Sequence, residues 1–275
     1  MADNEVEVEI PIEENGDNGD DQTMGEAEAE ATAAPEDDPT GLENIEPAVP
    51  EHVTFLDCLR SPIVELVVGT GADATILSAH QGLLTSSPFF AEACAQFDER
   101  SQPRRIELPN DDLSATSSVL EYLYKGDYFP TITNQAMEYD STVPHPDNEG
   151  VALLRHARVY ILAKRLELPK LATLAHRKIH LTQSTAKGEI EYARFVYRET
   201  SAEDNIRRPV AQFWATRSHV LRHEAEQEFK RMCLEYPQFG FDVLSLVLDA
   251  QEKRSSRAEV VSSGTSSGRK RQRMI

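Results

Sequence analysis

Cysteine is scarce in this 275-residue chain, which has three. Cys58, Cys94 and Cys233 are far apart, and none has a second cysteine or a histidine at the spacing that metal ligands require. His176 and His180 are four residues apart, but two ligands are too few for a metal site, and the segment lacks the glutamate of a metalloprotease motif. We therefore expect reduced thiols, no metal and no cofactor.

Long apolar runs are also missing. No segment approaches the roughly 20 apolar residues of a membrane span, and the N-terminal region has neither the basic nor the apolar part of a signal peptide. The sequence therefore predicts a soluble chain that does not enter a membrane.

Positive charge is absent from the first 59 residues, which contain nineteen Asp and Glu. This excess equals the net charge of −19, because the other 28 acidic residues balance the 28 basic residues of the chain. Residues 1–52 also have almost no bulky apolar side chains to offset the entropic cost of ordering them. We expect them to form an acidic disordered arm, either a solubilising leader or an interaction segment.

Residues 253–275 form a Ser/Gly-rich tail of opposite charge. Short basic clusters in such tails are typical of nuclear import signals, although they also occur as polyanion contacts or as solvated ends. The import candidates are Arg269, Lys270, Arg271 and Arg273.

The central part of the chain is close to neutral. Residues 60–249 carry a net charge of −5 and have no basic stripe with interleaved aromatic residues. This composition argues against direct nucleic-acid binding.

Two glycines follow the first strongly apolar run. Gly69 and Gly71 satisfy the loose form of a dinucleotide fingerprint, and Glu92 lies near the expected acidic offset. A nucleotide site would need a helix that begins at these glycines, whereas residues 75–77 favour a strand and Glu92 falls within a helical pattern. We interpret the glycines as the turn of a β-hairpin and keep an enzyme with a nucleotide site there as a distant alternative.

Periodicity and capping residues predict an α+β order for the next segment. Ser87 and Pro88 are a typical N-cap and first residue of a helix, and Gly126 is a typical residue just past a helix end. The expected elements are strands over 63–68, 74–79 and 104–108, and helices over 80–86, 88–97 and 111–124.

This segment resembles the BTB/POZ domain, in the form found in many filamentous-fungal proteins. The similarity lies in "VELVVG", "ILSAHQGLLTSSPFFAEACAQFDE", "RRIELPNDDLSATSSVLEYLYKGDY" and the later helix pair "ARVYILAKRLELPKLATLAHRKI". It implies a small sheet flanked by a cluster of helices over residues 53–183, with a surface insertion at 129–149. The matching residues are His80, Ser87, Pro88, Phe89, Phe90, Tyr122, Tyr124, Gly126 and Tyr128.

These matching residues are expected to be structural and not catalytic. We expect the His80 side chain to cap or bridge buried backbone groups. Many members of the family have an acidic and a basic residue where this chain has Ile63 and Gln81. The loss of both charges argues against the charged groove used by some repressors of that family.

Residues 184–252 are predicted to form an all-α extension. Trp214 has helical spacing with neighbouring apolar residues and is expected to be core rather than an exposed binding residue.

The resemblance implies a protein–protein interaction module without catalytic activity. One hypothesis is a nuclear regulatory scaffold, and the alternative is a substrate adaptor of a cullin-type ubiquitin ligase. The expected localisation is the nucleus, with the cytoplasm as the alternative. Family members often form homodimers through their first helix, and the segment before Ile63 has an apolar face that needs a cover. The candidates for the dimer interface are Val53, Phe55, Leu56 and Leu59.

Overall fold

The computed structural model describes residues 53–98 and 103–264, which belong to one compact unit. It is a mixed α+β structure, about 62% helical with a small sheet, which confirms the predicted class. The acidic arm at 1–52 and the basic cluster at 269–273 lie outside the described residues.

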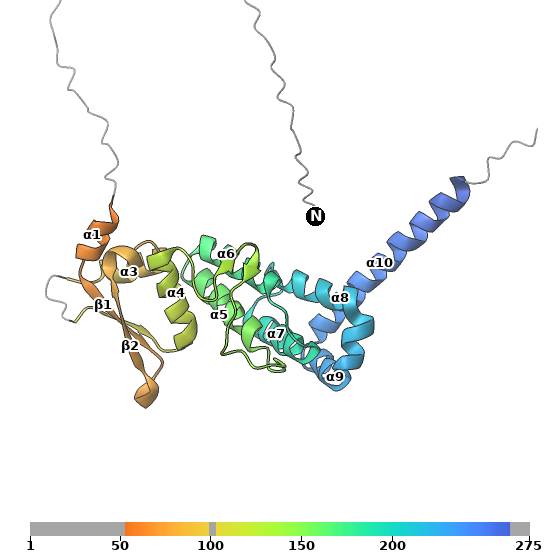
Figure 1. Cartoon of the computed structure of the whole chain (residues 1–275), viewed down its shortest axis with the longest axis horizontal. Coiled ribbons are helices and arrows are strands. Elements are labelled where there is room, and N and C mark those ends of the chain that lie inside the picture. Colours follow the sequence, from red (N-terminus) through yellow and green to blue (C-terminus); the bar gives the residue numbers. More distant parts are fainter. Residues whose placement is uncertain (1–52, 99–102, 265–275) are drawn as a thin grey trace, which may run out of the picture. The chain divides into compact units, whose positions relative to one another are not determined.

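The main sheet has three strands in the order β2-β1-β3 (Figure 1). Their bounds are Ile63–Val68 for β1, Thr75–His80 for β2 and Arg105–Leu108 for β3. β1 pairs antiparallel with β2, with Val64 opposite Ala79, and parallel with β3, with Leu66 opposite Ile106. The side chains of Val64 and Leu66 are fully buried, so one face of the sheet is in the core.

The turn between β1 and β2 confirms the hairpin that the glycines predict. Gly69 and Gly71 have φ values of 88° and 64°, a conformation that costs little only for glycine. A short 3₁₀ turn, η1 (Gly71–Asp73), completes the connection. Glu92 lies on a helix, as the pattern predicts.

Four helices accompany the sheet. They are α1 (Phe55–Arg60), α2 (Gln81–Leu84), α3 (Pro88–Ala95) and α4 (Leu113–Lys125). The Oγ of Ser87 accepts a hydrogen bond from the backbone N–H of Phe90 and caps α3, and a carboxylate oxygen of Asp112 accepts one from Ala115 and caps α4. Gly126 ends α4 with φ 77°.

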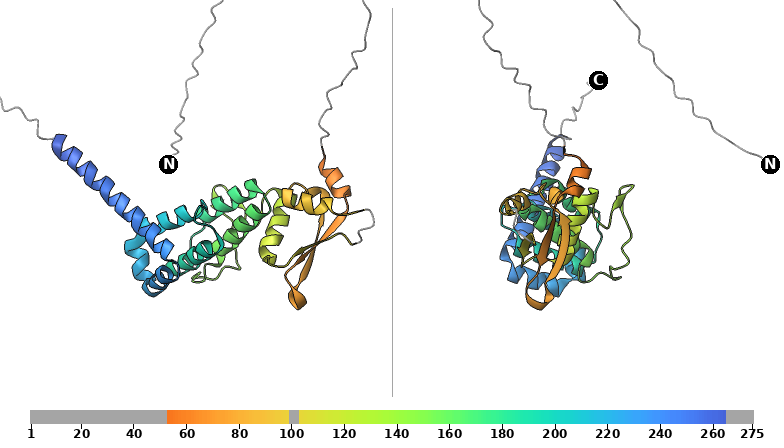
Figure 2. Two further views of the ribbon diagram at one scale, coloured as in Figure 1. Left: turned by 180° about the vertical axis from the view of Figure 1, so that it is seen from behind. Right: turned by 90° about the vertical axis from the view of Figure 1, so that its left-hand side faces the viewer.

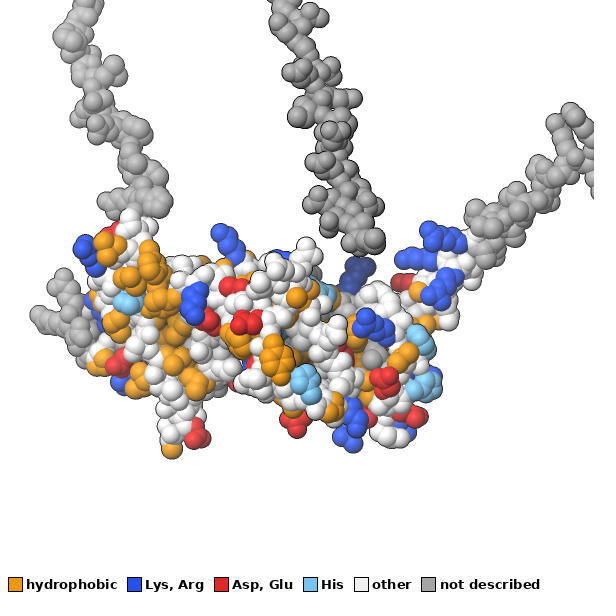
Figure 3. All heavy atoms as spheres, viewed as in Figure 1, with side chains coloured by type: hydrophobic (Ala, Val, Ile, Leu, Met, Phe, Trp, Pro, Cys, Tyr) orange, Lys and Arg blue, Asp and Glu red, His pale blue; other side chains and the backbone are white. Residues whose placement is uncertain are grey.

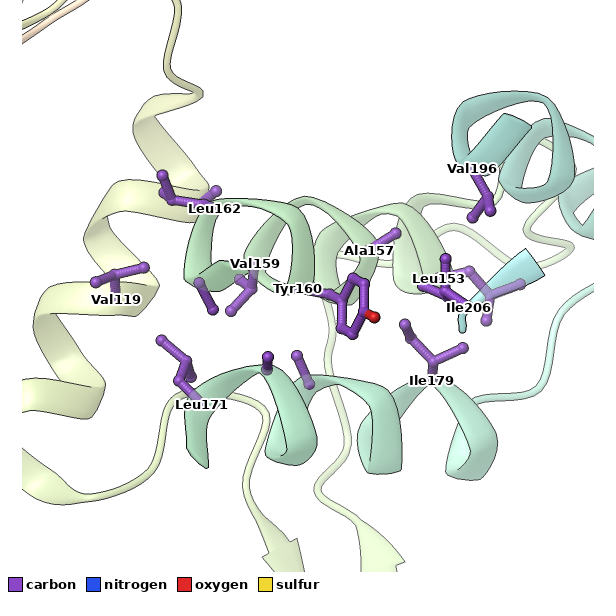
Figure 4. Packing of buried hydrophobic residues seen from close by; sticks show 14 of the residues in the cluster. Val119, Leu153, Ala157, Val159, Tyr160, Leu162, Leu171, Ile179, Val196 and Ile206 are labelled. Carbon is purple, nitrogen blue, oxygen red and sulfur yellow. The ribbon is translucent and has the colours of Figure 1, made fainter. Parts of the chain in front are cut away.

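The predicted helix pair follows as α5 (Val151–Arg165) and α6 (Pro169–Leu181). Figure 4 shows Val159 and Leu162 of α5 facing Leu171 of α6 and Val119 of α4. All four side chains are buried, so the helix pair and the helix beside the sheet share one core.

The segment over 129–149, which the sequence predicts as a surface insertion, is attached to helix α5 by several polar contacts. It contains the two-stranded sheet of β4 (Ile132–Thr133) and β5 (Ala136–Met137). Asp140 forms a buried ion pair with Arg155 of α5, and the carboxylate of Asp147 accepts hydrogen bonds from the backbone N–H groups of residues 151 and 152 at the start of that helix. These polar anchors hold the segment against the helices.

The extension consists of α7 (Ala186–Glu199), α8 (Arg207–Glu224), α9 (Glu226–Glu235) and α10 (Pro237–Gly264). Trp214 of α8 is fully buried, as predicted, and its ring lies 5.4 Å from that of Phe229 and 6.2 Å from that of Phe239. Helix α7 packs on α5, and the left view of Figure 2, seen from behind, shows the two helices side by side. The extension therefore continues the core of the preceding helices.

Most element boundaries differ from the expected ones by one or two residues, and the difference at the C-terminal helix is larger. Helix α10 continues through Gly264, so residue 253 does not begin an unstructured tail. The helix can continue because no glycine or proline interrupts residues 253–263. Within it, the Ser255 hydroxyl donates a hydrogen bond to the Gln251 carbonyl. Within the predicted all-α extension, a break occurs at Ala225, where φ −132° and ψ 47° separate α8 from α9. In the described part of the chain, no helix is both long and apolar enough to cross a membrane.

Candidate protein-interaction surface

Helix α1 is built by strong local signals. The Thr54 hydroxyl accepts a hydrogen bond from the Asp57 backbone N–H at 3.2 Å, and the Asp57 carboxylate accepts one from the Thr54 backbone N–H at 2.9 Å. This reciprocal capping box starts the helix, and the hydrogen bonds from Thr54 lower the pKa of Asp57. A helix of six residues needs such caps, because it is too short to be stable by itself.

The inner side of α1 contacts α2 closely. The Gly82 backbone N–H donates to the Ser61 hydroxyl at 2.8 Å, and that hydroxyl donates to the Cys58 carbonyl at 2.6 Å. A Cβ atom at Gly82 would lie only 2.9 Å from the Cα of Cys58. The two helices therefore meet backbone to backbone at this point, which fixes α1 in place.

The outer side of α1 has no cover among the described residues. The exposed fractions are 66% for Val53, 56% for Phe55, 53% for Leu56 and 39% for Leu59. We call these four residues the α1 apolar face. Ile63, at the start of β1, is 49% exposed, and Figure 3 shows hydrophobic side chains gathered over α1 and the neighbouring sheet.

His80 behaves differently from the sequence expectation. Its side chain makes no capping hydrogen bond to the backbone. Instead, the Tyr124 hydroxyl lies 2.7 Å from Nδ1 of His80 and accepts a hydrogen bond from the His80 backbone N–H at 3.0 Å. The expectation fails because the phenol of α4 reaches the junction of β2 and α2 from 44 residues away, which no local pattern reveals.

The other matching residues have structural contacts. The buried Ser87 hydroxyl donates to the Leu166 carbonyl at 2.5 Å and so ties α3 to the end of α5. Phe90 and Tyr128 are fully buried, whereas Phe89, Tyr122 and Tyr124 are partly buried against the core. Pro88 is the first residue of α3, where its missing N–H costs nothing.

Ile63 and Gln81 lie together, as their places in the sequence imply. Ile63 pairs with His80 across β1 and β2, directly before Gln81. The Gln81 side-chain oxygen accepts a hydrogen bond from the Arg104 guanidinium at 2.5 Å. Neither Ile63 nor Gln81 carries a charge, so the acidic and basic pair is absent beside α1, and the positive charge at this position comes from Arg104.

A buried ionic cluster around Lys178 was not predicted from the sequence. Lys178 of α6 is fully buried, and its Nζ donates to the Asp127 carboxylate at 2.5 Å, to the Tyr128 carbonyl and to the Pro130 carbonyl at 2.9 Å. The same Nζ lies 3.8 Å from the centre of the Tyr128 ring. The sequence could have indicated that Lys178 is buried, because it lies three residues after Ala175 and seven after Leu171, on the apolar face of α6.

Three histidines lie on the helix pair, His156 on α5 and His176 and His180 on α6. The Tyr128 hydroxyl lies 3.0 Å from Nδ1 of His156, and burial lowers the pKa of His156 to about 3. The rings of His176 and His180 meet edge to face at 4.5 Å. The described residues contain no group of three or more His, Cys, Asp or Glu side chains that could hold a metal ion.

Comparison with known proteins adds no identification. No protein-family model matches the sequence, and no curated protein is significantly similar to it. The function is therefore inferred from the residues and from their geometry.

Proposed function

We propose that this chain is a non-catalytic protein-interaction module with a BTB/POZ fold that forms a homodimer through the α1 apolar face. The observation that carries the proposal is the asymmetry of α1. Its inner side is fixed on α2 by close backbone contact, while its outer side presents Val53, Phe55, Leu56 and Leu59 to solvent. A capped, anchored helix with an uncovered apolar face is typical of a surface that another protein covers.

The arrangement of the sheet and helices supports the BTB/POZ part of the proposal. An antiparallel hairpin with a third, parallel strand is followed by α4 and then by the α5 and α6 pair, in the order that the sequence resemblance implies. Of the residues that carry the resemblance, His80, Ser87, Pro88 and Gly126 lie where one element ends or the next begins.

A second copy of the chain is the proposed occupant of the α1 apolar face. Pairing about a two-fold axis would cover the same side chains on both copies. Phe55 and Leu56 are each about half exposed. Their burial would contribute about 1 kcal/mol per side chain, half the usual value for complete burial, and the symmetry doubles the total.

The proposed setting is a nuclear regulatory scaffold. The support is the basic cluster at 269–273, together with Lys253 and Arg254, which are exposed on α10. The second candidate is an adaptor of a cullin-type ubiquitin ligase, favoured by the way in which α7 packs on α5 and extends the domain. In that case the free surface would bind the cullin.

The test replaces Phe55 and Leu56 by serine and measures self-association by sedimentation velocity at tens of micromolar. The variant should sediment as a folded monomer. A matched control replaces Phe241 and Leu244 of α10, which are 64% and 56% exposed, by serine and should leave the dimer intact. If the α1 variant remains dimeric, or if the α10 control alone becomes monomeric, the α1 apolar face is not the interface.

A further inference from the structure

A large cavity lies between the β4 and β5 segment and helices α5 to α8. Its volume is about 1260 Å³, which is above the ~300–1,000 Å³ typical of small-molecule sites. Apolar side chains from four helices line it, among them Leu153, Ile179, Tyr192, Val210 and Phe213. Thr182, Gln183 and Ser184, from the connection between α6 and α7, also line it, and we call these three polar residues the polar rim.

Glu189 faces this cavity without a partner. Its residue is 8% exposed, and within the described part of the chain its carboxylate has neither a hydrogen bond nor an ion pair. The surrounding structure fixes its position, because the Thr185 hydroxyl caps α7 at the Gly188 N–H and donates to the Asp147 carbonyl at 3.0 Å. An anchored but unpaired carboxylate is costly in a folded protein and is therefore typical of a binding site.

The other charged groups around the cavity do not neutralise Glu189. Arg155 is paired with Asp140, and Arg217 packs over the Phe213 ring at 4.5 Å and lies beyond ion-pair distance of Glu189. Burial raises the pKa of Glu189 to about 7, although the charge of Arg217 opposes this shift. Burial of His156 lowers its pKa and keeps its ring neutral near pH 7.

We propose that this cavity binds an extended peptide of a partner protein and that a Lys or Arg side chain of the peptide pairs with the Glu189 carboxylate. The aliphatic part of that side chain would lie along Leu153, Val210 and Phe213, while its cationic group would form a charged hydrogen bond with the Glu189 carboxylate. The polar rim offers hydrogen-bonding groups to the peptide backbone. This site is separate from the α1 apolar face and does not depend on dimer formation.

The volume of the cavity favours a peptide over a free amine. A free alkylammonium ion would fill only a small part of about 1260 Å³ and would leave the polar rim without contacts. A peptide of several residues fills more of the space and uses both the apolar wall and the rim.

The test uses the full chain with labelled methyl groups and the pentapeptide Ac-Ala-Ala-Lys-Ala-Ala-amide. We expect saturable shifts of the methyl signals of Met137, Leu153 and Val210, which line the cavity. Glu189→Gln should weaken binding at least tenfold. The matched control is Glu191→Gln on the same helix, whose carboxylate pairs with Arg194 at 2.5 Å, and it should stay within twofold of the unmodified chain.

Two further probes separate the parts of the proposal. A peptide with norleucine in place of lysine keeps the stem and removes the charge, and it should bind at least tenfold more weakly. n-Butylammonium should bind more weakly than the lysine peptide; equal affinity would mean that the site takes a free amine and would overturn the peptide assignment. The absence of saturable shifts, or equal binding by Glu189→Gln, would overturn the site itself.

Binding should also depend on pH. Ionisation of Glu189 with a pKa of about 7 should strengthen binding about tenfold between pH 6 and pH 8. The other charged or titratable side chains that line the cavity are His145, His156, His180, Arg155, Arg217, Asp140 and Glu138, and all of them remain in Glu189→Gln. Glu189→Gln should lose most of this dependence.

Discussion

At the scale of single residues, Lys178 holds three parts of the chain together. Its ammonium group satisfies the Asp127 carboxylate and the carbonyls of Tyr128 and Pro130, and it has no exposed surface. Replacing it with methionine keeps the apolar stem but leaves those acceptors without their donor. We expect Lys178→Met to lower the free energy of unfolding by about 2–4 kcal/mol, as measured by urea unfolding at pH 7.

Lys125 offers a matched control, because its side chain is 69% exposed and pairs only with Glu121 four residues earlier in α4. Lys125→Met should change the free energy of unfolding by less than about 0.5 kcal/mol. Equal effects of the two replacements would show that the buried contacts of Lys178 contribute nothing.

Glu189 gives a pH-dependent prediction of stability. Its pKa of about 7 lies above the unfolded value of 4.5, so the folded state binds the proton more tightly than the unfolded state does. The penalty for burying the charge is present above pH 7 and disappears as the pH falls towards 4.5. Glu189→Gln should therefore be more stable than the unmodified chain by up to about 3 kcal/mol at pH 8, and the difference should shrink at pH 5.

Urea unfolding at pH 8 and pH 5 checks this prediction. Both proteins contain neutral, buried His156, which lowers the stability of each as the pH falls below 6.5, so this effect cancels in the comparison. A stability difference between the two proteins that is the same at both pH values would contradict the assigned pKa of Glu189.

Residue-level features were predictable from the sequence only where the cause is local. Helical spacing placed Trp214 in the core, and the Ser87 and Pro88 pair marked a helix start. The buried position of Lys178 was not predicted, and the expected role of His80 was wrong, because their partners are 51 and 44 residues away in the chain. Helical spacing places Lys178 on the apolar face of α6 but does not reveal which groups it contacts.

At the scale of elements, Gly82 controls how α1 sits on α2. A Cβ atom there would lie 2.9 Å from the Cα of Cys58 and 3.1 Å from the Ser61 hydroxyl, so the helices must separate to accommodate it. We expect Gly82→Ala to loosen α1, to speed hydrogen exchange of the amides of residues 55–60 and to weaken self-association. Hydrogen-exchange mass spectrometry measures the exchange of these amides, and sedimentation velocity measures the self-association.

The control for this replacement is Gly240→Ala in α10. A Cβ atom at Gly240 would lie 3.5 Å from the Cys233 sulfur, an ordinary contact, and alanine favours a helix more than glycine does. Gly240→Ala should therefore leave exchange in α1 unchanged. If Gly82→Ala also leaves it unchanged, the close contact does not hold α1.

The sequence predicted most elements but not all of their ends. The strands at 63–68 and 104–108 and the hairpin turn follow from alternation and from glycine, both of which act locally. The length of α10 and the break at Ala225 were not predicted. A Ser-rich basic segment can still form a helix when no glycine or proline interrupts it, as in α10. The break at Ala225 was not predicted because no glycine or proline lies at this position in the sequence.

At the scale of the whole molecule, the proposed nuclear role depends on the basic cluster of the C-terminal tail. Replacing Arg269, Lys270, Arg271 and Arg273 by alanine removes four positive charges from this tail. A fluorescent fusion of this variant should move from the nucleus to the cytoplasm, because import receptors recognise such clusters by charge. The same distribution for both proteins would favour the adaptor hypothesis over the nuclear scaffold.

The central claim is that the α1 apolar face pairs two copies of the chain. The most direct measurement is the light-scattering mass of the unmodified full-length protein over a dilution series from tens of micromolar downward. The chain has a mass of 30.8 kDa, and we predict twice that mass at the upper concentrations, falling towards the single-chain mass on dilution. A mass of 30.8 kDa throughout the series would contradict the homodimer and would leave the α1 apolar face to a different protein.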